Sequence, residues 1–423
     1  MLMASAPALA LRALALVAVV WVLVAAFPAA AATSAASVND EEEAVVIEED
    51  DAGSLRITTR DPNSKLFLNG VDVLQQLAEQ RALLDQIQRV QCTLAPLIDT
   101  TTLAGVGSPA AGLYSNAVRA NNGLIYGIPR NADNVVIINP LTNTADTTTM
   151  ASPALLSASD KWASAVLAPN GLIYGIPGAH EAVLVIDPNT NTFNSTAIVV
   201  GEPNETKWQA AALSNEGKIY ALPVSSSTPI LVLDTATNTA STLPNPLSTI
   251  GFAWTSAVTA PNNDRIYGVP YQASFVLILD PATNATDVTT IMGLGGNAKW
   301  ASAALAPSGL IYGIPLNALD LLVINPFTDT ADRVPLSQAA PGTPKWWGAV
   351  PLLNSDLIVG IPHAMTSVLV VDTATNATRE VHVPGLDTDV YSRFIGGAVS
   401  LSNRVYAMPF DEDAILTIDG SCL

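Results

Sequence analysis

Short apolar runs recur along most of this chain, separated by Thr, Asn, Pro and Gly. The hexapeptide LIYGIP occurs three times and four variants share its pattern, which gives seven copies. Its tyrosine lies at positions 126, 174, 220, 267, 312 and 406, with Val359 in the sixth copy, so successive copies are 45 to 48 residues apart. A fixed period of this length is the signature of a repeat architecture.

Each copy predicts four strands in the same order. An aromatic residue and a run of small residues come first, as in residues 162–167, and a turn such as Asn170-Gly171 leads into the IYGIP strand. Asn-Gly favours a type I′ hairpin turn, and the closing proline has no N–H to donate to a neighbouring strand. A third strand such as 183–186 and an Asp-Pro-x-Thr-Asn turn precede a Thr-rich fourth strand. The pattern predicts an all-β fold, a seven-bladed β-propeller of four-stranded antiparallel blades.

The ends of the repeat region predict how the ring closes. The seventh copy stops after its third strand, residues 415–418, whereas residues 97–103 match the fourth strand of the first copy. We expect residues 97–103 to pair with 415–418, because an open strand edge would otherwise remain. The same alignment places Cys92 and Cys422 in one turn region, which predicts a disulfide in an exported protein. Two free buried thiols are the alternative.

The N-terminal residues 1–32 differ from the repeats. Arg12 precedes an apolar run and a row of small residues, the pattern of a secretory signal peptide. The protein is therefore expected to be secreted or at the extracellular surface, with no membrane span after signal removal; an uncleaved membrane anchor is the alternative. Four N-x-Ser/Thr triplets are predicted N-glycosylation sites and agree with export: Asn194, Asn204, Asn284 and Asn376.

Two segments separate the signal peptide from the propeller, which is expected to occupy residues 93–423. Residues 33–52 contain a dense acidic run and predict a disordered tether. Residues 53–92 predict a short hairpin and then a helix with one apolar stripe. This helix either packs against the propeller or forms a short coiled coil through residues 71–91, which would make a homo-oligomer.

Charge and motif content exclude several classes of function. The formal net charge is −19, with 18 Lys and Arg against 37 Asp and Glu. Nucleic-acid binding needs a concentrated basic surface, so no nucleic-acid partner is expected. Neither a Gly-x-Ser-x-Gly elbow, a P-loop nor an HExxH zinc motif occurs. No enzymatic activity and no cofactor is predicted, with calcium or another divalent ion as the alternative.

Candidate binding residues lie where the loops of a propeller meet around its channel. Four copies begin with Lys-Trp, and Tyr114, Trp254 or Phe394 takes the aromatic position in the others. A ring of aromatic and cationic side chains can stack sugars or hold anionic ligands. The alternative is that each aromatic residue wedges between neighbouring blades. The candidates are Lys161, Trp162, Lys207, Trp208, Trp254, Lys299, Trp300, Lys345 and Trp346.

The loops after the IYGIP proline differ from copy to copy, which is typical of specificity loops on a rigid scaffold. They add four candidate binding residues: Arg130, His180, Tyr271 and His363. Glu181 with the two histidines is a candidate acid–base or metal site. The loop residues Asp411, Glu412 and Asp413 are candidate calcium ligands, with a solvated acidic loop as the alternative.

The repeat resembles a broad group of propellers with YVTN-type, NHL-type and streptogramin-lyase-like repeats. Segments such as Gly171–Pro177 and Val183–Thr192 carry the resemblance, which covers residues 97–419. It implies the propeller architecture, whereas function depends on the site that a fold carries. The lyase-like members use a His and a Glu with a metal, and neither role maps onto a residue of this chain.

The leading hypothesis is therefore an extracellular recognition or adhesion module that binds glycan or protein through the Lys-Trp face. A metal-assisted hydrolase or lyase with a site built from loops is the second hypothesis. The third is a structural coat or matrix component.

Overall fold

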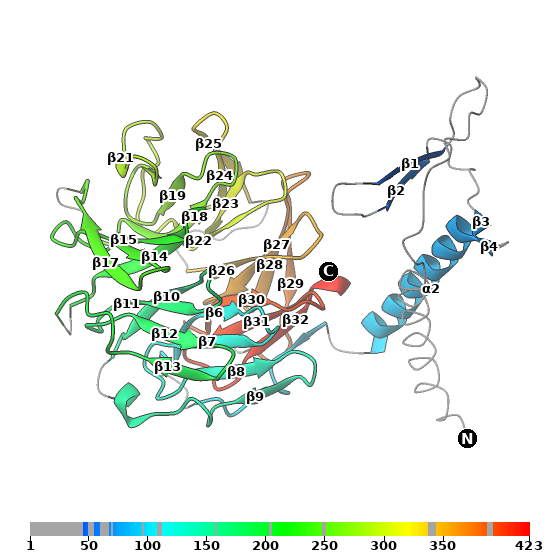
Figure 1. Ribbon diagram of the computed structural model, residues 1–423, viewed down its shortest axis with the longest axis horizontal. Helices are drawn as coiled ribbons and strands as arrows, with labels where there is room; N and C mark the ends of the chain where they lie inside the picture. Colours follow the sequence, from blue (N-terminus) through cyan, green and yellow to red (C-terminus); the bar gives the residue numbers. More distant parts are fainter. Residues whose placement is uncertain are drawn as a thin grey trace. The chain divides into compact units, whose positions relative to one another are not determined.

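A computed structural model describes most of the repeat region and parts of the N-terminal region (Figure 1). It divides into two units, Met1–Ala82 and Leu83–Leu423. The predicted signal peptide and Asn204 lie outside the described residues. The described segments are 45–49, 55–59, 67–68, 71–94, 97–107, 112–156, 159–202, 205–247, 251–336, 344–386 and 392–423.

The first unit contains two small antiparallel pairs. Strand β1 (Val45–Glu49) pairs with β2 (Leu55–Thr59), and β3 (Phe67–Leu68) pairs with β4 (Val71–Asp72). Strand β1 lies within residues 33–52, for which a disordered tether is predicted, and the other residues of that segment lie outside the described ones. Charge dominates the composition there, but residues 45–47 read Val-Val-Ile, and β-branched residues favour a strand.

The helix α2 (Val73–Leu94) begins in the first unit and ends in the second. Its Leu77 and Leu83 side chains are half exposed, and a coiled coil through this helix stays a prediction. Within the described residues, no helix has the length and apolarity needed to cross a membrane.

The second unit is an all-β propeller, which confirms the predicted fold class (Figure 1). Seven four-stranded antiparallel sheets follow one another, and each runs from an inner first strand to an outer fourth strand. The first strands are β6 (Tyr114–Arg119), β10 (Trp162–Leu167), β14 (Trp208–Leu213), β18 (Trp254–Thr259), β22 (Trp300–Leu305), β26 (Trp346–Pro351) and β30 (Phe394–Val399). The second strands are β7 (Ile125–Pro129), β11 (Ile173–Pro177), β15 (Lys218–Pro223), β19 (Ile266–Pro270), β23 (Ile311–Pro315), β27 (Leu357–Pro362) and β31 (Arg404–Pro409).

The outer half of each blade completes this order. The third strands are β8 (Val136–Asn139), β12 (Leu184–Asp187), β16 (Ile230–Asp234), β20 (Leu277–Asp280), β24 (Asp320–Asn325), β28 (Ser367–Asp372) and β32 (Leu416–Asp419). The fourth strands are β9 (Thr144–Asp146), β13 (Thr192–Asn194), β17 (Thr239–Leu243), β21 (Ala285–Asp287), β25 (Thr330–Pro335), β29 (Ala377–His382) and β5 (Ile98–Asp99).

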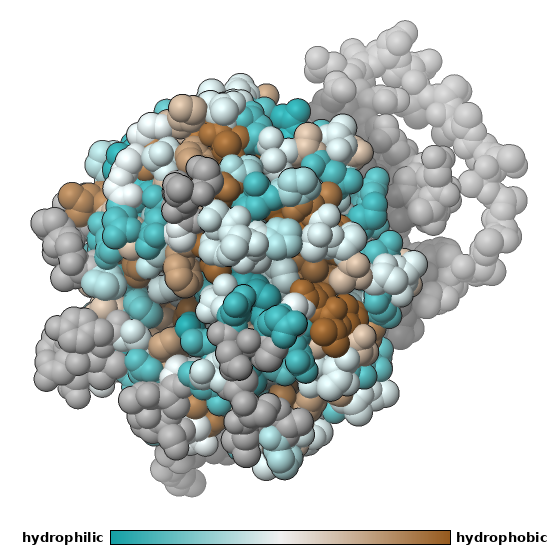
Figure 2. All heavy atoms as spheres, turned by 90° about the vertical axis from the view of Figure 1, so that its left-hand side faces the viewer, coloured by the Kyte–Doolittle hydropathy of each residue, from teal (hydrophilic) through white to brown (hydrophobic). Residues whose placement is uncertain are grey.

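Burial is highest in the second strands and lowest in most of the fourth strands. The IYGIP residues of β7 and β11 are buried throughout, because they lie between two strands of their own sheet and between two blades. The fourth strand β17, in contrast, is mostly exposed and rich in Thr and Ser. The side of the molecule in Figure 2 is largely teal and white, with separated brown areas. The core therefore lies between blades, in a series of apolar layers around the ring.

The ring closes by joining the two ends of the repeat region. Strand β5 pairs with β32, with Ile98 opposite Ile418 and Asp99 opposite Thr417. Figure 1 shows the blue-cyan start of the propeller beside its red end. An isolated bridge between Ala104 and Ala414 extends the pairing. The predicted disulfide is present between Cys92 and Cys422, whose Cα atoms are 5.6 Å apart.

Tyrosines of the second strands bind the neighbouring blade. The Tyr174 hydroxyl donates to Asn238 Oδ1 at 2.5 Å, and the Tyr406 hydroxyl donates to Asn143 Oδ1 at 3.1 Å across the ring closure. Each acceptor lies in the turn between third and fourth strands, with a left-handed φ near 50° to 60° that Asn adopts more readily than most residues. A tyrosine hydroxyl makes this contact in six of the seven blades, with Asp329 in place of Asn as the acceptor for Tyr267.

The sixth blade departs from this pattern for a structural reason. It has Val359 at the tyrosine position, and the next blade takes its fourth strand from β5, so no continuous turn follows β32. The hydroxyl is therefore missing where the turn that would accept its hydrogen bond is also missing.

Replacement of Tyr312 by Phe tests the hydrogen bonds between blades. Its hydroxyl donates to Asn376 Oδ1 at 2.7 Å and lies 3.0 Å from the Thr373 carbonyl oxygen. We expect Tyr312→Phe to lower the free energy of unfolding by about 1 kcal/mol, the usual net value of such a bond. Tyr271→Phe is the matched control, because the structure shows no hydrogen bond from that hydroxyl to the described residues. Equal urea midpoints for the two variants would contradict the proposed role.

The disulfide is expected to be a large single contributor to stability. It closes a loop with a sequence separation of 330 residues, and the chain-entropy model gives such a loop about 6 kcal/mol. The double variant Cys92→Ser, Cys422→Ser should therefore unfold at clearly lower urea concentration than the oxidised protein. The wild-type protein in reductant should match the double variant. A midpoint unchanged by both treatments would show that the β5–β32 pairing holds the ring closed by itself.

Candidate functional site

The first strands line the channel and carry a bulge at their start. In five blades the pairing with the second strand shifts register between the leading aromatic residue and the residue two positions later. In β26 the shift spans Trp346 to Ala349, and in β30 it lies between Ile395 and Gly397. A bulge leaves its extra residue outside the ladder and redirects its side chain. The bulged positions of all seven blades therefore meet at the upper face, which we define as the face formed by the loops between blades and the loops between second and third strands.

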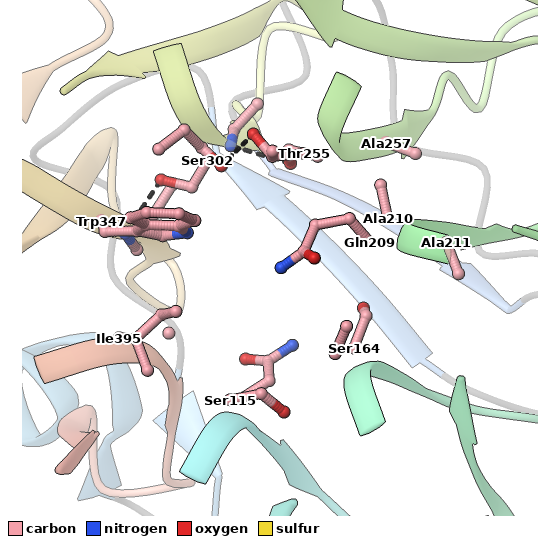
Figure 3. Close-up of a pocket in the computed structure, with 18 of the residues that line it drawn as sticks. Ser115, Ser164, Gln209, Ala210, Ala211, Thr255, Ala257, Ser302, Trp347 and Ile395 are labelled. Atoms are coloured by element: carbon pink, nitrogen blue, oxygen red, sulfur yellow. Dashed lines mark hydrogen bonds between the residues drawn. The ribbon is translucent and has the colours of Figure 1, made fainter. Parts of the chain in front are cut away.

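A cavity of about 190 Å³ opens in the channel at this face. Residues from all seven first strands line it, and most of them are Ala, Ser, Thr or Gly (Figure 3). The lining contains no Asp, Glu, Lys, Arg or His. The site is therefore suited to a neutral ligand that forms hydrogen bonds.

Hydroxyl groups in the lining satisfy the inner edges of the first strands. The Ala303 N–H donates to Ser256 Oγ at 3.0 Å, and the Gly348 N–H donates to Ser302 Oγ at 2.9 Å. The Thr255 hydroxyl donates to the Ala301 carbonyl at 3.0 Å. These bonds join neighbouring first strands directly, and buried backbone groups need such partners. The hydroxyls therefore hold the channel wall together.

Trp347 is the one large aromatic side chain in this lining. It lies on the bulge of β26, and in Figure 3 its indole extends into the cavity. Gly348, the next residue, has a φ of 149°, and a Cβ there would lie 2.6 Å from Ile361 Cγ1, so the bulge requires glycine. The Trp347 ring lies 6.0 Å from the ring of Tyr271 and 5.1 Å from that of His363. These two neighbours hold the indole in place beside the cavity.

Gln209 faces Trp347 across the same space. It lies on the bulge of β14, and Figure 3 shows its carboxamide directed into the cavity. Within the part of the chain that the structure describes, this carboxamide forms no hydrogen bond, so both its donors and its acceptor are available to a ligand. Asn116 adds a second amide to the lining, although its Oδ1 already accepts the Ala117 N–H.

An aromatic arc continues from Trp347 around the upper face. The His363 ring lies 6.3 Å from the Phe410 ring. The Arg130 guanidinium lies over the Phe410 ring, 5.0 Å from its centroid. Arg130 Nε also pairs with Asp160 Oδ1 at 2.5 Å. The structure thus brings three of the four predicted loop residues, Arg130, Tyr271 and His363, into one arc beside the cavity.

His180 lies apart from this arc and stacks on Trp162, with ring centroids 4.6 Å apart. Burial lowers the pKa of His180 and of His363 below the ordinary value of histidine, although the carbonyls of Ala182 and Phe394 partly oppose the shift. Both imidazoles are therefore neutral at neutral pH. The formal charge of the arc is therefore that of Arg130, which is paired with Asp160.

The tryptophans of the four Lys-Trp pairs, and Trp254 at the same position of another blade, lie inside the protein, in agreement with the wedge alternative. Each is at most 1% exposed, and its Nε1–H donates to a backbone carbonyl at the start of the third strand, as Trp300 does to Asp320 at 2.8 Å. Trp300 packs against residues of two successive blades. The prediction that these tryptophans stack against a ligand disagrees with their burial, because buried indoles present no face to a ligand. The set is Trp162, Trp208, Trp254, Trp300 and Trp346.

The lysines of these pairs are buried as well. Lys299 Nζ donates to the carbonyls of Tyr271, Ala273 and Gly296 at 2.7 to 3.1 Å, which ties the loop before β22 to the preceding blade. Lys207 Nζ donates in the same way to the carbonyls of Glu202 and Glu205. Burial lowers the pKa of Lys161 to about 8 and also lowers that of Lys345. Their burial places these four residues in the wall beneath the loops.

The acidic candidates have structural partners. Glu412 accepts a hydrogen bond from the buried Arg393 at 2.9 Å, and Asp411 accepts the Gly112 N–H at 3.2 Å. Glu181 is exposed beside His180, and Asp413 is exposed as well. Within the described residues, no three His, Cys, Asp or Glu side chains are close enough to share one metal ion.

Three predicted glycosylation sites lie at the surface. Asn194 is exposed at the end of β13, and Asn284 and Asn376 are exposed in turns between third and fourth strands. Both turn residues also accept a tyrosine hydroxyl through Oδ1, which leaves the amide nitrogen, the atom that glycosylation modifies, outside that bond. Glycosylation at these positions stays a prediction.

The residues that the sequence reasoning missed are Trp347, Gln209 and Asn116. In the repeat alignment they fall one or two positions after the leading aromatic residue, where most blades have Ala, Ser, Thr or Gly. The signal was present as a large side chain in a column of small ones. Its meaning depended on the bulge, which turns that column toward the channel.

Asp287, the last residue of β21, offers a test of the hydrogen bonds that lower the pKa of a carboxyl group. A hydrogen bond from the Thr290 hydroxyl, followed by the Thr289 N–H, lowers the pKa of Asp287 to about 2. Because the folded pKa lies below the unfolded one, this contribution to stability is present above pH ~4 and is lost as the pH falls toward 2. We expect Thr290→Val to lower the urea midpoint at pH 4.5 and to have little effect near pH 2. In an Asp287→Asn background the effect of Thr290→Val should not depend on pH.

Comparison with known proteins supports the architecture. No family model and no curated protein matches the sequence. Among solved structures, virginiamycin B lyase from Staphylococcus aureus has a TM-score of 0.61 at 9% identity, covering 76% of this chain and 98% of the lyase. A streptogramin B lyase structure has a TM-score of 0.57 at 11% identity, covering 76% and 96%.

An extracellular domain of a putative one component system from B. thetaiotaomicron has a TM-score of 0.53 at 12% identity, covering 87% of this chain and 46% of that one. These likenesses show that the chain shares the seven-bladed propeller fold of streptogramin B lyases. A binding or recognition role is compatible with this fold, and the disulfide and the extracellular neighbours fit an extracellular location.

Proposed function

We propose that this protein is an extracellular recognition module whose channel mouth binds a neutral saccharide. The observation that carries the proposal is the pairing of Trp347 with the free carboxamide of Gln209 across one cavity. An aromatic face packs on the apolar face of a sugar ring, while amides and hydroxyls bind its hydroxyl groups. A small number of well-placed polar groups in a concave site is the usual arrangement of a ligand pocket.

The size and charge of the cavity narrow the ligand. Its volume of about 190 Å³ is below the range of roughly 300–1,000 Å³ typical for drug-sized ligands. The cavity therefore suits one ring, such as the end of a glycan chain, with the remainder of the glycan lying over the upper face. The lining carries no ionised group, so neutral sugars are favoured over sialylated or sulfated ones.

A glycan-array screen of the mature protein tests this function. We expect selective binding to neutral glycans, reduced at least tenfold by Trp347→Ala and by Gln209→Ala. Phe327→Ala is the matched control: this exposed side chain belongs to a turn between β24 and β25, and its loss should leave binding unchanged.

Two results would contradict the proposal. A blank array would exclude a saccharide as the ligand and would favour a protein partner of the same face. Binding that survives Trp347→Ala would place the saccharide elsewhere. The screen is run with and without chelator, because the hydrolase or lyase hypothesis requires a metal and predicts that chelator changes the interaction or the integrity of the bound glycan.

A further inference from the structure

A second hollow lies in the channel directly below the cavity. It has a volume of about 350 Å³ and is lined by the second halves of five first strands, β10, β14, β18, β22 and β26. Its walls consist of Ala, Val and Leu side chains with one threonine and one proline. The hydroxyl of that threonine, Thr259, already donates to the Leu213 carbonyl at 2.7 Å. The lower hollow therefore offers a ligand almost exclusively apolar contacts.

The two hollows meet at a ring of alanines. Five residues belong to the lining of both: Ala165, Ala211, Ala257, Ala303 and Ala349. Alanine has the smallest side chain apart from glycine. These five residues therefore narrow the channel less than larger side chains would at the same positions. Along one strand, Gln209 in the upper cavity and Leu213 in the lower hollow are four residues apart, a rise of about 13 Å.

The chemistry of the channel changes across this ring. Above it lie the amides of Gln209 and Asn116 and the indole of Trp347; below it lie side chains such as Val258 and Leu305. We propose that the channel binds an amphiphile, with its neutral hydroxyl-rich head at Trp347 and a single hydrocarbon chain extending past the alanines into the lower hollow. The position of the head rests on the proposed function, whereas the site of the chain rests on the lower hollow alone.

The wall chemistry of the lower hollow favours a hydrocarbon chain over other occupants. Strands of five of the seven blades form its walls, which hold no charged group that would attract an ion. An alkyl chain gains free energy for each methylene that it buries, and the Ala, Val and Leu side chains of this hollow supply the apolar contact. The five alanines shared with the upper cavity connect this apolar surface to the site of the head.

Matched glycosides separate the two parts of this site. Methyl β-D-glucopyranoside and octyl β-D-glucopyranoside, below its micelle concentration, share one head and differ in the chain; 1-octanol supplies the chain without the sugar. Binding of each to the full-length mature protein is measured by calorimetry. We expect the octyl glycoside to bind at least tenfold more tightly than the methyl glycoside, and 1-octanol to bind with measurable affinity.

Two variants assign these affinities to their sites. Leu305→Asp places a charge in the lower hollow and alters no residue of the upper cavity, so it should remove the advantage of the octyl chain while leaving methyl glycoside binding unchanged. Trp347→Ala should weaken the methyl glycoside and leave 1-octanol binding intact. Circular dichroism checks that each variant is folded, and Leu213→Asp replaces Leu305→Asp if it is not.

The outcomes distinguish the two proposals. Equal affinities for methyl and octyl glycosides in the wild-type protein, or no binding of any of the three probes, would overturn the amphiphile. Binding of 1-octanol without methyl glycoside, lost in Leu305→Asp, would support the chain site even if the saccharide proposal failed.

Discussion

The closed ring depends on the pairing of β5 with β32. A propeller blade is stable only between two neighbours, because both faces of its sheet are apolar and the layers between blades form the core. If the last blade lacked its fourth strand, the edge of β32 would be open and the layer between the sixth and seventh blades would lose part of its cover. The Cys92–Cys422 disulfide acts at the same seam and fixes it covalently.

Once closed, the ring is held by contacts that repeat from blade to blade. The buried tryptophans fill the space between successive sheets, and their indole N–H groups bind the start of the third strand. In six of the seven blades, a tyrosine hydroxyl joins the second strand to a turn of the next blade. These residues are repeated because every blade needs the same packing. This explains why Val359 replaces tyrosine beside the seam, where the turn that would accept the bond does not exist.

Function, in contrast, is expected where the repeat is broken. Trp347 and Gln209 stand in a column whose other members are Ser, Ala, Thr and one Ile, and the bulges of β26 and β14 direct them into the channel. A small side chain at that position keeps the channel open and does little else. A large or amide-bearing one changes what the channel can bind without disturbing the layers between blades. The scaffold and the binding surface are therefore separable in this fold.

The sequence by itself determined the number of blades, the order of strands within each, and the residues that join the two ends, because these follow from local periodicity and from turn residues with fixed preferences. The sequence also allowed two interpretations of the Lys-Trp pairs and did not distinguish between them, since an aromatic residue at the start of a strand can face a ligand or a neighbouring blade. Only the tertiary structure decided this, by showing that the space between blades takes the indole of Trp300 and its equivalents. It also identified Trp347, because a cavity arises from seven strands distant in sequence, and no local pattern records which side chains meet there.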